Sequence, residues 1–170
     1  MYEGWAITRW KTPVVDMDRL RLVSLVDDNR DLTLLLEDGR DPARSRWRVS
    51  FRSYPAYRNI QEEFRIALWE WLDQSKQRCG STFTVQESPT LASWHTGHLA
   101  DLFRDIKHFV VATDDDVVEV LSGEEPLWEP ADPGRPNDPV PGKSQHLYLG
   151  EDAADTERLR LAIQQRNRRH

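Results

Sequence analysis

The segment from Lys107 to Ser122 constrains the fold more than any other part of this sequence. It reads KHFVVATDDDVVEVLS, with a run rich in β-branched residues on each side of three consecutive aspartates. Valine, threonine and phenylalanine favour extended strands, and aspartate tolerates the backbone of a tight turn. The segment therefore predicts an antiparallel β-hairpin, and with it a protein built around an antiparallel sheet.

Further runs of strand-forming residues predict the rest of that sheet. The clearest is Ser45 to Arg52, where Trp47, Val49 and Phe51 alternate with arginine and serine. Such alternation places one face of a strand on a core and the other toward solvent or toward other charges. Weaker strand patterns cover residues 2–10, 19–26, 31–37, 82–86 and 145–149.

Three segments predict helices. Residues 62–74 carry apolar side chains at helical spacing, and only Ile66 and Trp69 fall outside the resulting stripe. Residues 88–104 predict a second helix, and residues 151–169 predict a peripheral C-terminal helix. Six of the ten prolines lie in residues 124–143, which predicts an extended surface loop there.

These elements fit one domain over residues 1–170. Hydrophobic residues make up 38% of the chain and charged residues 31%, a balance typical of a globular protein. The chain is also long enough to bury a core of its own. We expect an α+β fold, with a mostly antiparallel sheet of about five to seven strands and two or three helices mainly on one face.

The net charge and the cysteine content indicate which kinds of partner and which cellular compartment suit this protein. The net charge of −6 disfavours binding to phosphate backbones and favours a basic protein partner. The one cysteine, Cys79, excludes an internal disulfide and fits a reducing compartment. The sequence shows no signal-peptide pattern and no apolar run near the ~20 residues of a membrane span. We expect a cytoplasmic protein that binds neither membrane nor nucleic acid, and we leave homo-oligomerisation open.

The chain carries none of the common catalytic signatures. It has no G-x-S-x-G nucleophile elbow, no phosphate-binding loop and no G-x-G-x-x-G pattern. We therefore assign no catalytic residue and expect no cofactor. The sequence favours a protein that is not an enzyme.

Two histidines and an aspartate are the candidates for metal binding. His95, His98 and Asp101 follow one another at three-residue spacing, so a helix would bring them to one face. Pairs of histidines at this spacing arise often by chance, and Gly97 between them weakens a helix. Ordinary surface histidines are the simpler interpretation, and we expect no metal.

Arginines on the clearest predicted strand form a second candidate site. Arg46, Arg48 and Arg52, with Arg58 beyond them, suit the forked recognition of carboxylate or phosphate groups. Three glutamates lie on neighbouring predicted strands: Glu37, Glu87 and Glu119. Cross-strand pairing with these glutamates explains the arginines without a ligand, and we favour that interpretation.

The junction between the strand and the first helix offers contacts for a ligand or a partner. Tyr54, Tyr57, Arg58 and Glu62 bring aromatic and charged groups together there. They predict, as an alternative function, a small-ligand binder or an enzyme. Ile66 and Trp69 on the outer helix face are either covered by the proline-rich loop or used to contact a partner.

Two segments carry a resemblance to a known class of proteins. FRSYPAYRNIQEEFRIALWEWL (residues 51–72) and IKHFVVATDDDVVEVLS (residues 106–122) resemble parts of small uncharacterised bacterial α+β proteins. Some of those proteins are similar in size, acidity and organisation to immunity proteins of bacterial toxin systems. The resemblance covers 39 residues and assigns no residue a role. It implies a non-enzymatic, immunity-like module that binds a protein through an acidic surface.

Overall fold

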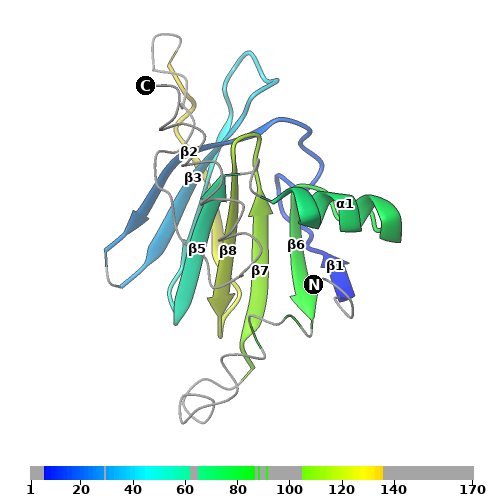
Figure 1. The fold of residues 1–170 in the computed structure, drawn as a ribbon. Helices are drawn as coiled ribbons and strands as arrows, with labels where there is room; N and C mark the ends of the chain where they lie inside the picture. The colour runs from blue at the N-terminus through cyan, green and yellow to red at the C-terminus, as the bar shows by residue number, and fades with distance from the viewer. Residues whose placement is uncertain are drawn as a thin grey trace, which may run out of the picture.

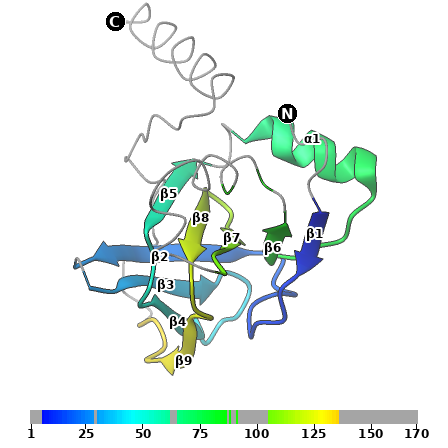
Figure 2. The ribbon, with the colours of Figure 1, turned by 90° about the horizontal axis from the view of Figure 1, so that it is seen from below.

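The computed structural model describes residues 6–28, 30–61, 65–86, 88, 91 and 105–135. In this part of the chain two antiparallel sheets pack face to face, and one helix covers the other side of the larger sheet (Figures 1 and 2). The larger sheet has the strand order β1-β6-β7-β8-β5 and the smaller has the order β2-β3-β4-β9. The elements are β1 (Ala6–Arg9), β2 (Leu20–Asp27), β3 (Leu32–Asp38), β4 (Arg46–Phe51), β5 (Ala56–Gln61), α1 (Ile66–Ser75), β6 (Thr82–Gln86), β7 (Lys107–Ala112), β8 (Asp116–Ser122) and β9 (Leu127–Ala131).

The expected fold class is wrong. Instead of one sheet with two or three helices, the described residues form nine strands in two sheets and a single helix of 10 residues. Two of the strands had no clear sequence signal. The β5 strand follows Tyr54-Pro55 directly and lacks regular alternation, and β9 contains Pro130. The predicted helix over 88–104 lies outside the described residues except at positions 88 and 91, and the predicted strand 145–149 and helix 151–169 lie wholly outside them.

The predicted hairpin is confirmed. Strands β7 and β8 pair antiparallel, with Phe109 opposite Val120 and Val111 opposite Val118. The turn closes where the Thr113 amide donates to the Asp116 carbonyl at 2.8 Å. The amide of Asp114 donates to the Leu20 carbonyl at 2.7 Å, which ties this turn to the smaller sheet.

The main core lies between the two sheets. The alternation predicted for 45–52 is confirmed, because Val49 and Phe51 are buried while Arg48 is exposed. Aromatic rings join the layers, with ring centroids 5.8 Å apart for Phe51 and Phe109 and 4.9 Å apart for Trp10 and Phe109. The buried members of this core are Val14, Leu20, Leu32, Leu34, Leu36, Val49, Phe51, Phe109, Val111, Val118 and Val120.

A second core lies between α1 and the opposite face of the larger sheet. Leu68 and Leu72 are the buried residues of the helix in this core, as the apolar stripe predicts. Ile66 is 50% exposed, in agreement with its place outside the stripe. Trp69, which the stripe also excludes, is half-buried and packs against this core. The remaining buried members are Cys79, Phe83, Val85, Val110 and Val117.

The proline-rich segment contains a strand, so the expectation of a loop is wrong for residues 127–131. Strand β9 pairs antiparallel with β4 and forms an edge of the smaller sheet. Proline lacks an amide hydrogen and is tolerated at such an edge, where one side of the strand needs no partner. Residues 136–143 of the predicted loop lie outside the described residues.

Within the part of the chain that the structure describes, no helix has the length and apolar character needed to cross a membrane.

Truncation of Phe109 tests the packing of the two sheets. Phe109 is fully buried between them, so Phe109→Ala should lower the free energy of unfolding by about 3–5 kcal/mol. Val26→Ala is the control, because Val26 is 54% exposed and its truncation should cost less than about 1 kcal/mol. Urea unfolding measures both, and equal losses would contradict the proposed core.

Candidate functional site

Two of the residues predicted at the strand-to-helix junction, Tyr57 and Arg58, do not converge on one site. Tyr57 and Arg58 are neighbours on β5, so their side chains lie on opposite faces of the larger sheet. Tyr54 donates its hydroxyl hydrogen to Asp27 at 2.6 Å, and burial followed by this bond raises the pKa of Tyr54. Its ring packs against that of Tyr57. Glu62 lies outside the described residues.

The metal candidates His95, His98 and Asp101 also lie outside the described residues. Among the residues that are described, no group of three or more His, Cys, Asp or Glu side chains is placed to hold a metal ion. The described polar residues gather instead around two glutamates, one on each sheet.

The first cluster surrounds Glu119 on the helix-facing side of the larger sheet. Glu119 is 3% exposed and lies opposite Arg58 across the strand pair. Its Oε2 accepts hydrogen bonds from Arg58 Nη2 at 2.6 Å and Nε at 2.9 Å. Arg65, which directly precedes α1 and is fully buried, forms an ion pair with Oε1. One carboxylate therefore neutralises part of the charge of two arginines.

His108 extends this cluster into a chain of hydrogen bonds. Burial first, and then the charges of Arg58 and Arg65, lower the pKa of His108 to about 3. The neutral imidazole therefore donates from Nε2 to Glu119 at 3.0 Å and accepts at Nδ1 from Ser88 Oγ at 2.9 Å. Ser88 Oγ in turn accepts from the Leu91 amide at 3.0 Å.

This serine–histidine–glutamate chain has the residue types of a hydrolytic triad but not the properties. Ser88 and His108 are both fully buried, so no substrate carbonyl reaches the hydroxyl. A general base must also accept a proton near the working pH, whereas the pKa of His108 lies near 3. The cluster therefore has a structural role: it links strands β5, β7 and β8 to Arg65 and Ser88.

The buried state of His108 predicts how stability depends on pH. Unfolded histidine titrates near pH 6.5 and folded His108 near pH 3, so the unfolded chain binds the extra proton between these values. The contribution of neutral His108 to the free energy of unfolding is complete above pH 6.5. It is lost as the pH falls below that value, by up to about 1.4 kcal/mol per pH unit. Urea unfolding from pH 7 to 4.5 should show a shallower loss for His108→Gln than for the wild type. Parallel curves would contradict a neutral buried imidazole.

The second cluster lies on the side of the smaller sheet that faces away from the larger one, here called the outer face. Strand register arranges it in three rows across β2, β3, β4 and β9. The rows are Arg21–Glu37–Arg46–Ala131, Ser24–Leu35–Arg48–Glu129 and Val26–Thr33–Ser50–Leu127. No described helix or strand packs over this face.

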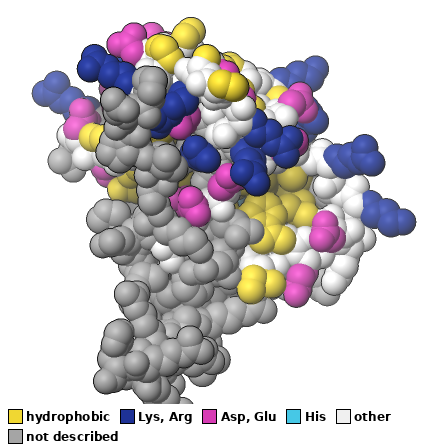
Figure 3. Space-filling view, turned by 90° about the horizontal axis from the view of Figure 1, so that it is seen from above, with side chains coloured by type: hydrophobic (Ala, Val, Ile, Leu, Met, Phe, Trp, Pro, Cys, Tyr) yellow, Lys and Arg dark blue, Asp and Glu magenta, His cyan; other side chains and the backbone are white. Residues whose placement is uncertain are grey.

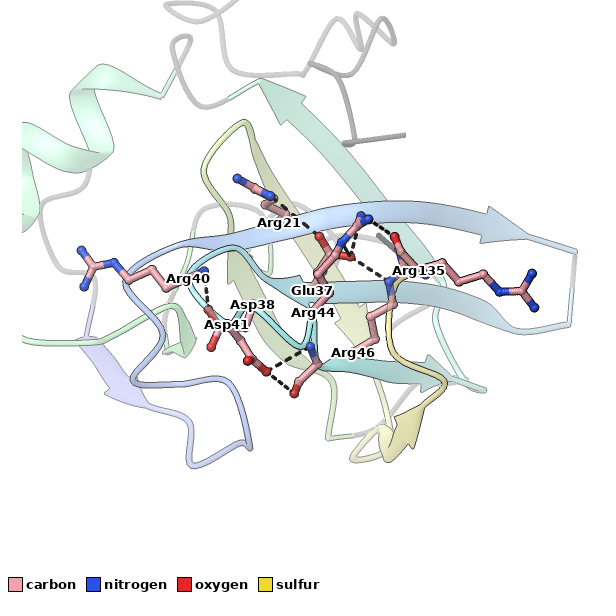
Figure 4. A network of polar contacts seen from close by, with 9 residues as sticks. Arg21, Glu37, Asp38, Arg40, Asp41, Arg44, Arg46 and Arg135 are labelled. Atoms are coloured by element: carbon pink, nitrogen blue, oxygen red, sulfur yellow. Dashed lines mark hydrogen bonds and ion pairs between the residues drawn. The ribbon is translucent and has the colours of Figure 1, made fainter. Parts of the chain in front are cut away.

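Glu37 is the centre of the first row (Figure 4). It is fully buried although it belongs to the outer face, because arginines surround its carboxylate. Its Oε2 lies 2.9 Å from Arg46 Nε and 3.0 Å from Arg44 Nη2, and its Oε1 lies 3.8 Å from Arg21 Nη1. Three guanidinium groups are thus held around one carboxylate.

The chain after β9 closes over this cluster. Arg44 has a positive φ of 53° and donates from Nη1 to the Arg135 carbonyl at 2.5 Å. Gly134 approaches so closely that a Cβ there would lie 2.7 Å from both Glu37 Oε2 and Arg46 Nη2. Only glycine fits at this position without displacement of a neighbour, so the segment over the cluster is closely fitted to it.

Most residues in the other two rows of the outer face are exposed to solvent, and Thr33, Leu35 and Ser50 are partly buried. Arg48 and Glu129 in the middle row are exposed, and Val26 and Leu127 at the two ends of the last row are 54% and 46% exposed. Figure 3 views the end of the molecule that carries the β7–β8 turn, and there lysine and arginine side chains gather near the middle, beside an apolar patch. On the outer face itself, the exposed residues Val26, Arg48, Leu127 and Glu129 combine charged and apolar groups.

Cross-strand pairing of arginine with glutamate, favoured from the sequence, is confirmed at two places. Arg46 lies opposite Glu37, and Arg58 lies opposite Glu119. The other members of both clusters were not predicted from the sequence: Arg21, Arg44, Arg65, Ser88 and His108. Arg21 had a signal in its position on a predicted strand beside that of Glu37, whereas Arg44 and Arg65 lie outside regular elements and had none.

Comparison with known proteins finds no matching family model, no matching curated protein and no matching solved structure. The resemblance of residues 51–72 and 106–122 to bacterial immunity proteins therefore stays a prediction.

Substitution of Gly134 tests the fit of the chain over Glu37. Gly134→Ala forces a methyl group against the side-chain ends of Glu37, Arg44 and Arg46, which must shift, and should lower the free energy of unfolding by about 1 kcal/mol. Gly123→Ala is the matched control, because its Cβ would meet only Ser53 Oγ at an ordinary 3.5 Å. Thermal or urea unfolding compares the two, and a Gly134→Ala protein as stable as the control would refute the close approach.

Proposed function

We propose that this protein is a non-enzymatic module that binds another protein through the outer face of its smaller sheet. The observation that carries the proposal is the exposure of Val26 and Leu127 at the two ends of a row next to the exposed Arg48. Arginine is enriched in protein interfaces, and the buried centre of an interface is more apolar than the rest of a protein surface.

The dimensions of the face support a protein partner. Four strands at about 4.8 Å spacing and about six residues in length cover roughly 20 by 20 Å. That area is roughly half of the ~800 Å² that each partner contributes to a standard interface. The turn at 39–45 and the segment 132–135 border this face and would enlarge the contact.

The environments of the described ionisable groups support a non-enzymatic role. Glu119 and Glu37 are enclosed by arginines, and His108 is neutral and buried. Cys79 is buried as well, and desolvation raises the pKa of its thiol, which disfavours the reactive thiolate. The alternative of a small-ligand site at Tyr54, Tyr57 and Arg58 has less support, because these side chains are divided between two faces of a sheet.

The biological role and the cellular compartment of this binding module are also proposals. An immunity-like role, in which the outer face contacts a toxin, is one form that such binding takes. We place the protein in the cytoplasm, since a single buried cysteine suits a reducing compartment.

Site-specific crosslinking tests the proposed face. A photoreactive amino acid introduced in place of Arg48 and expressed in native cells should crosslink to one discrete protein. The same amino acid in place of Arg78, an exposed arginine between α1 and β6, is the control and should not. The proposal fails if position 48 gives no adduct in cells, or if both positions give the same adducts.

A further inference from the structure

We propose that the outer face takes a protein surface rich in carboxylate groups. This inference rests on the proposed binding function and adds the chemistry of the partner. The site is the arginine row around Glu37 together with Arg48 in the next row.

The charge of the face is opposite to that of the chain. Four arginines on or over the outer face meet two glutamates, which leaves two positive charges in excess, while the whole chain carries −6. The arginines are Arg21, Arg44, Arg46 and Arg48, and the glutamates are Glu37 and Glu129. Salt screens charges beyond about 8–10 Å, so the local excess decides what docks here. The basic partner expected from the net charge therefore does not fit this face.

The buried glutamate prepares the arginines for binding. Buried ion pairs add little net stability, because desolvation offsets their attraction. Glu37 instead fixes three guanidinium groups whose side chains keep 27% (Arg21), 15% (Arg44) and 11% (Arg46) of their surface exposed. Ordering a long side chain on binding costs about 0.5–1.5 kcal/mol, and here that ordering precedes the partner. Guanidinium forks match the planar geometry of carboxylates.

The apolar neighbours favour protein over nucleic acid. Leu35 lies in the centre of the face, and Val26 and Leu127 lie at its edges. Two excess charges release few counterions from a nucleic acid, and the remaining acidic surface repels phosphates. A protein surface that combines carboxylates with apolar side chains satisfies both parts of this face.

Titration with charged peptides under amide-detected NMR tests the inference. The probes are a ten-residue glutamate peptide, a ten-residue lysine peptide and a single-stranded ten-residue oligothymidine. Wild type, Arg48→Glu and the charge-matched control Arg78→Glu are compared at low salt. The glutamate peptide should shift amides of β3 and β4 in the wild type and in Arg78→Glu. Arg48→Glu should weaken this binding roughly fivefold or more.

A second comparison separates positioning from charge. Gly134→Ala and Gly123→Ala leave the net charge unchanged, and only the first disturbs the arginines around Glu37. At a temperature well below its unfolding transition, Gly134→Ala should lower the affinity for the glutamate peptide severalfold, whereas Gly123→Ala should leave this affinity unchanged. Equal affinities would overturn the role of Glu37 in positioning.

Other outcomes overturn the partner chemistry. These are no shifts with the glutamate peptide, equal losses in Arg48→Glu and Arg78→Glu, or tighter binding of the lysine peptide or the oligothymidine to this face. If any of these occurs while crosslinking from position 48 still succeeds, the outer face binds a protein of other chemistry. The proposed function then stands and this inference falls.

Discussion

All seven residues of strand β8 are buried, and this burial determines how the sheets and the helix are layered. A strand covered on both faces needs a layer on each side, and the smaller sheet and helix α1 supply them. Val118 and Val120 face the smaller sheet, whereas Val117 packs with the helix. The three-layer arrangement follows from this one apolar hairpin strand.

The same burial explains the cluster around Glu119. This residue sits among valines in β8, so its charge is taken out of water and needs partners in place. Arg58 comes from the neighbouring strand, Arg65 from the start of the helix, and His108 from the strand on the other side. Glu37 meets a similar need on the smaller sheet, where Arg21 keeps 27% of its side-chain surface exposed and the neighbouring Arg48 is exposed. One cluster therefore serves the fold, and the other presents positive charge to solvent.

The elements that could be predicted from sequence are those with strong periodic patterns. The 107–122 hairpin, the strand at 45–52 and the helix around Leu68 and Leu72 were recognised from alternation or helical spacing. Strand β5 was missed because its residues AYRNIQ lack alternation. Strand β9 was missed because it contains a proline, which a sheet tolerates at an edge, and the sequence does not show which strand lies at an edge. The division into two sheets could not be predicted either, because strand-forming segments in a sequence do not show which strands pair.

The candidate site was predictable only in part, for a related reason. Opposed charges predicted that arginines pair with glutamates of neighbouring strands, as Arg46 does with Glu37, whereas Arg58 pairs with Glu119 from β5, a strand that was not predicted. Arg44 reaches Glu37 from a turn with a positive φ, and Gly134 reaches it from 97 residues along the chain. Contacts of this kind depend on the fold as a whole.

In the proposed complex, the arginines held by Glu37 and the neighbouring Arg48 contact the partner. Arginine footprinting of the isolated complex tests this most directly, with phenylglyoxal labelling read by mass spectrometry in the free and bound protein. Binding should slow the labelling of Arg48 and Arg21 and leave the labelling of Arg78 unchanged. Equal labelling of Arg48 in the free protein and in a fully formed complex would contradict this contact.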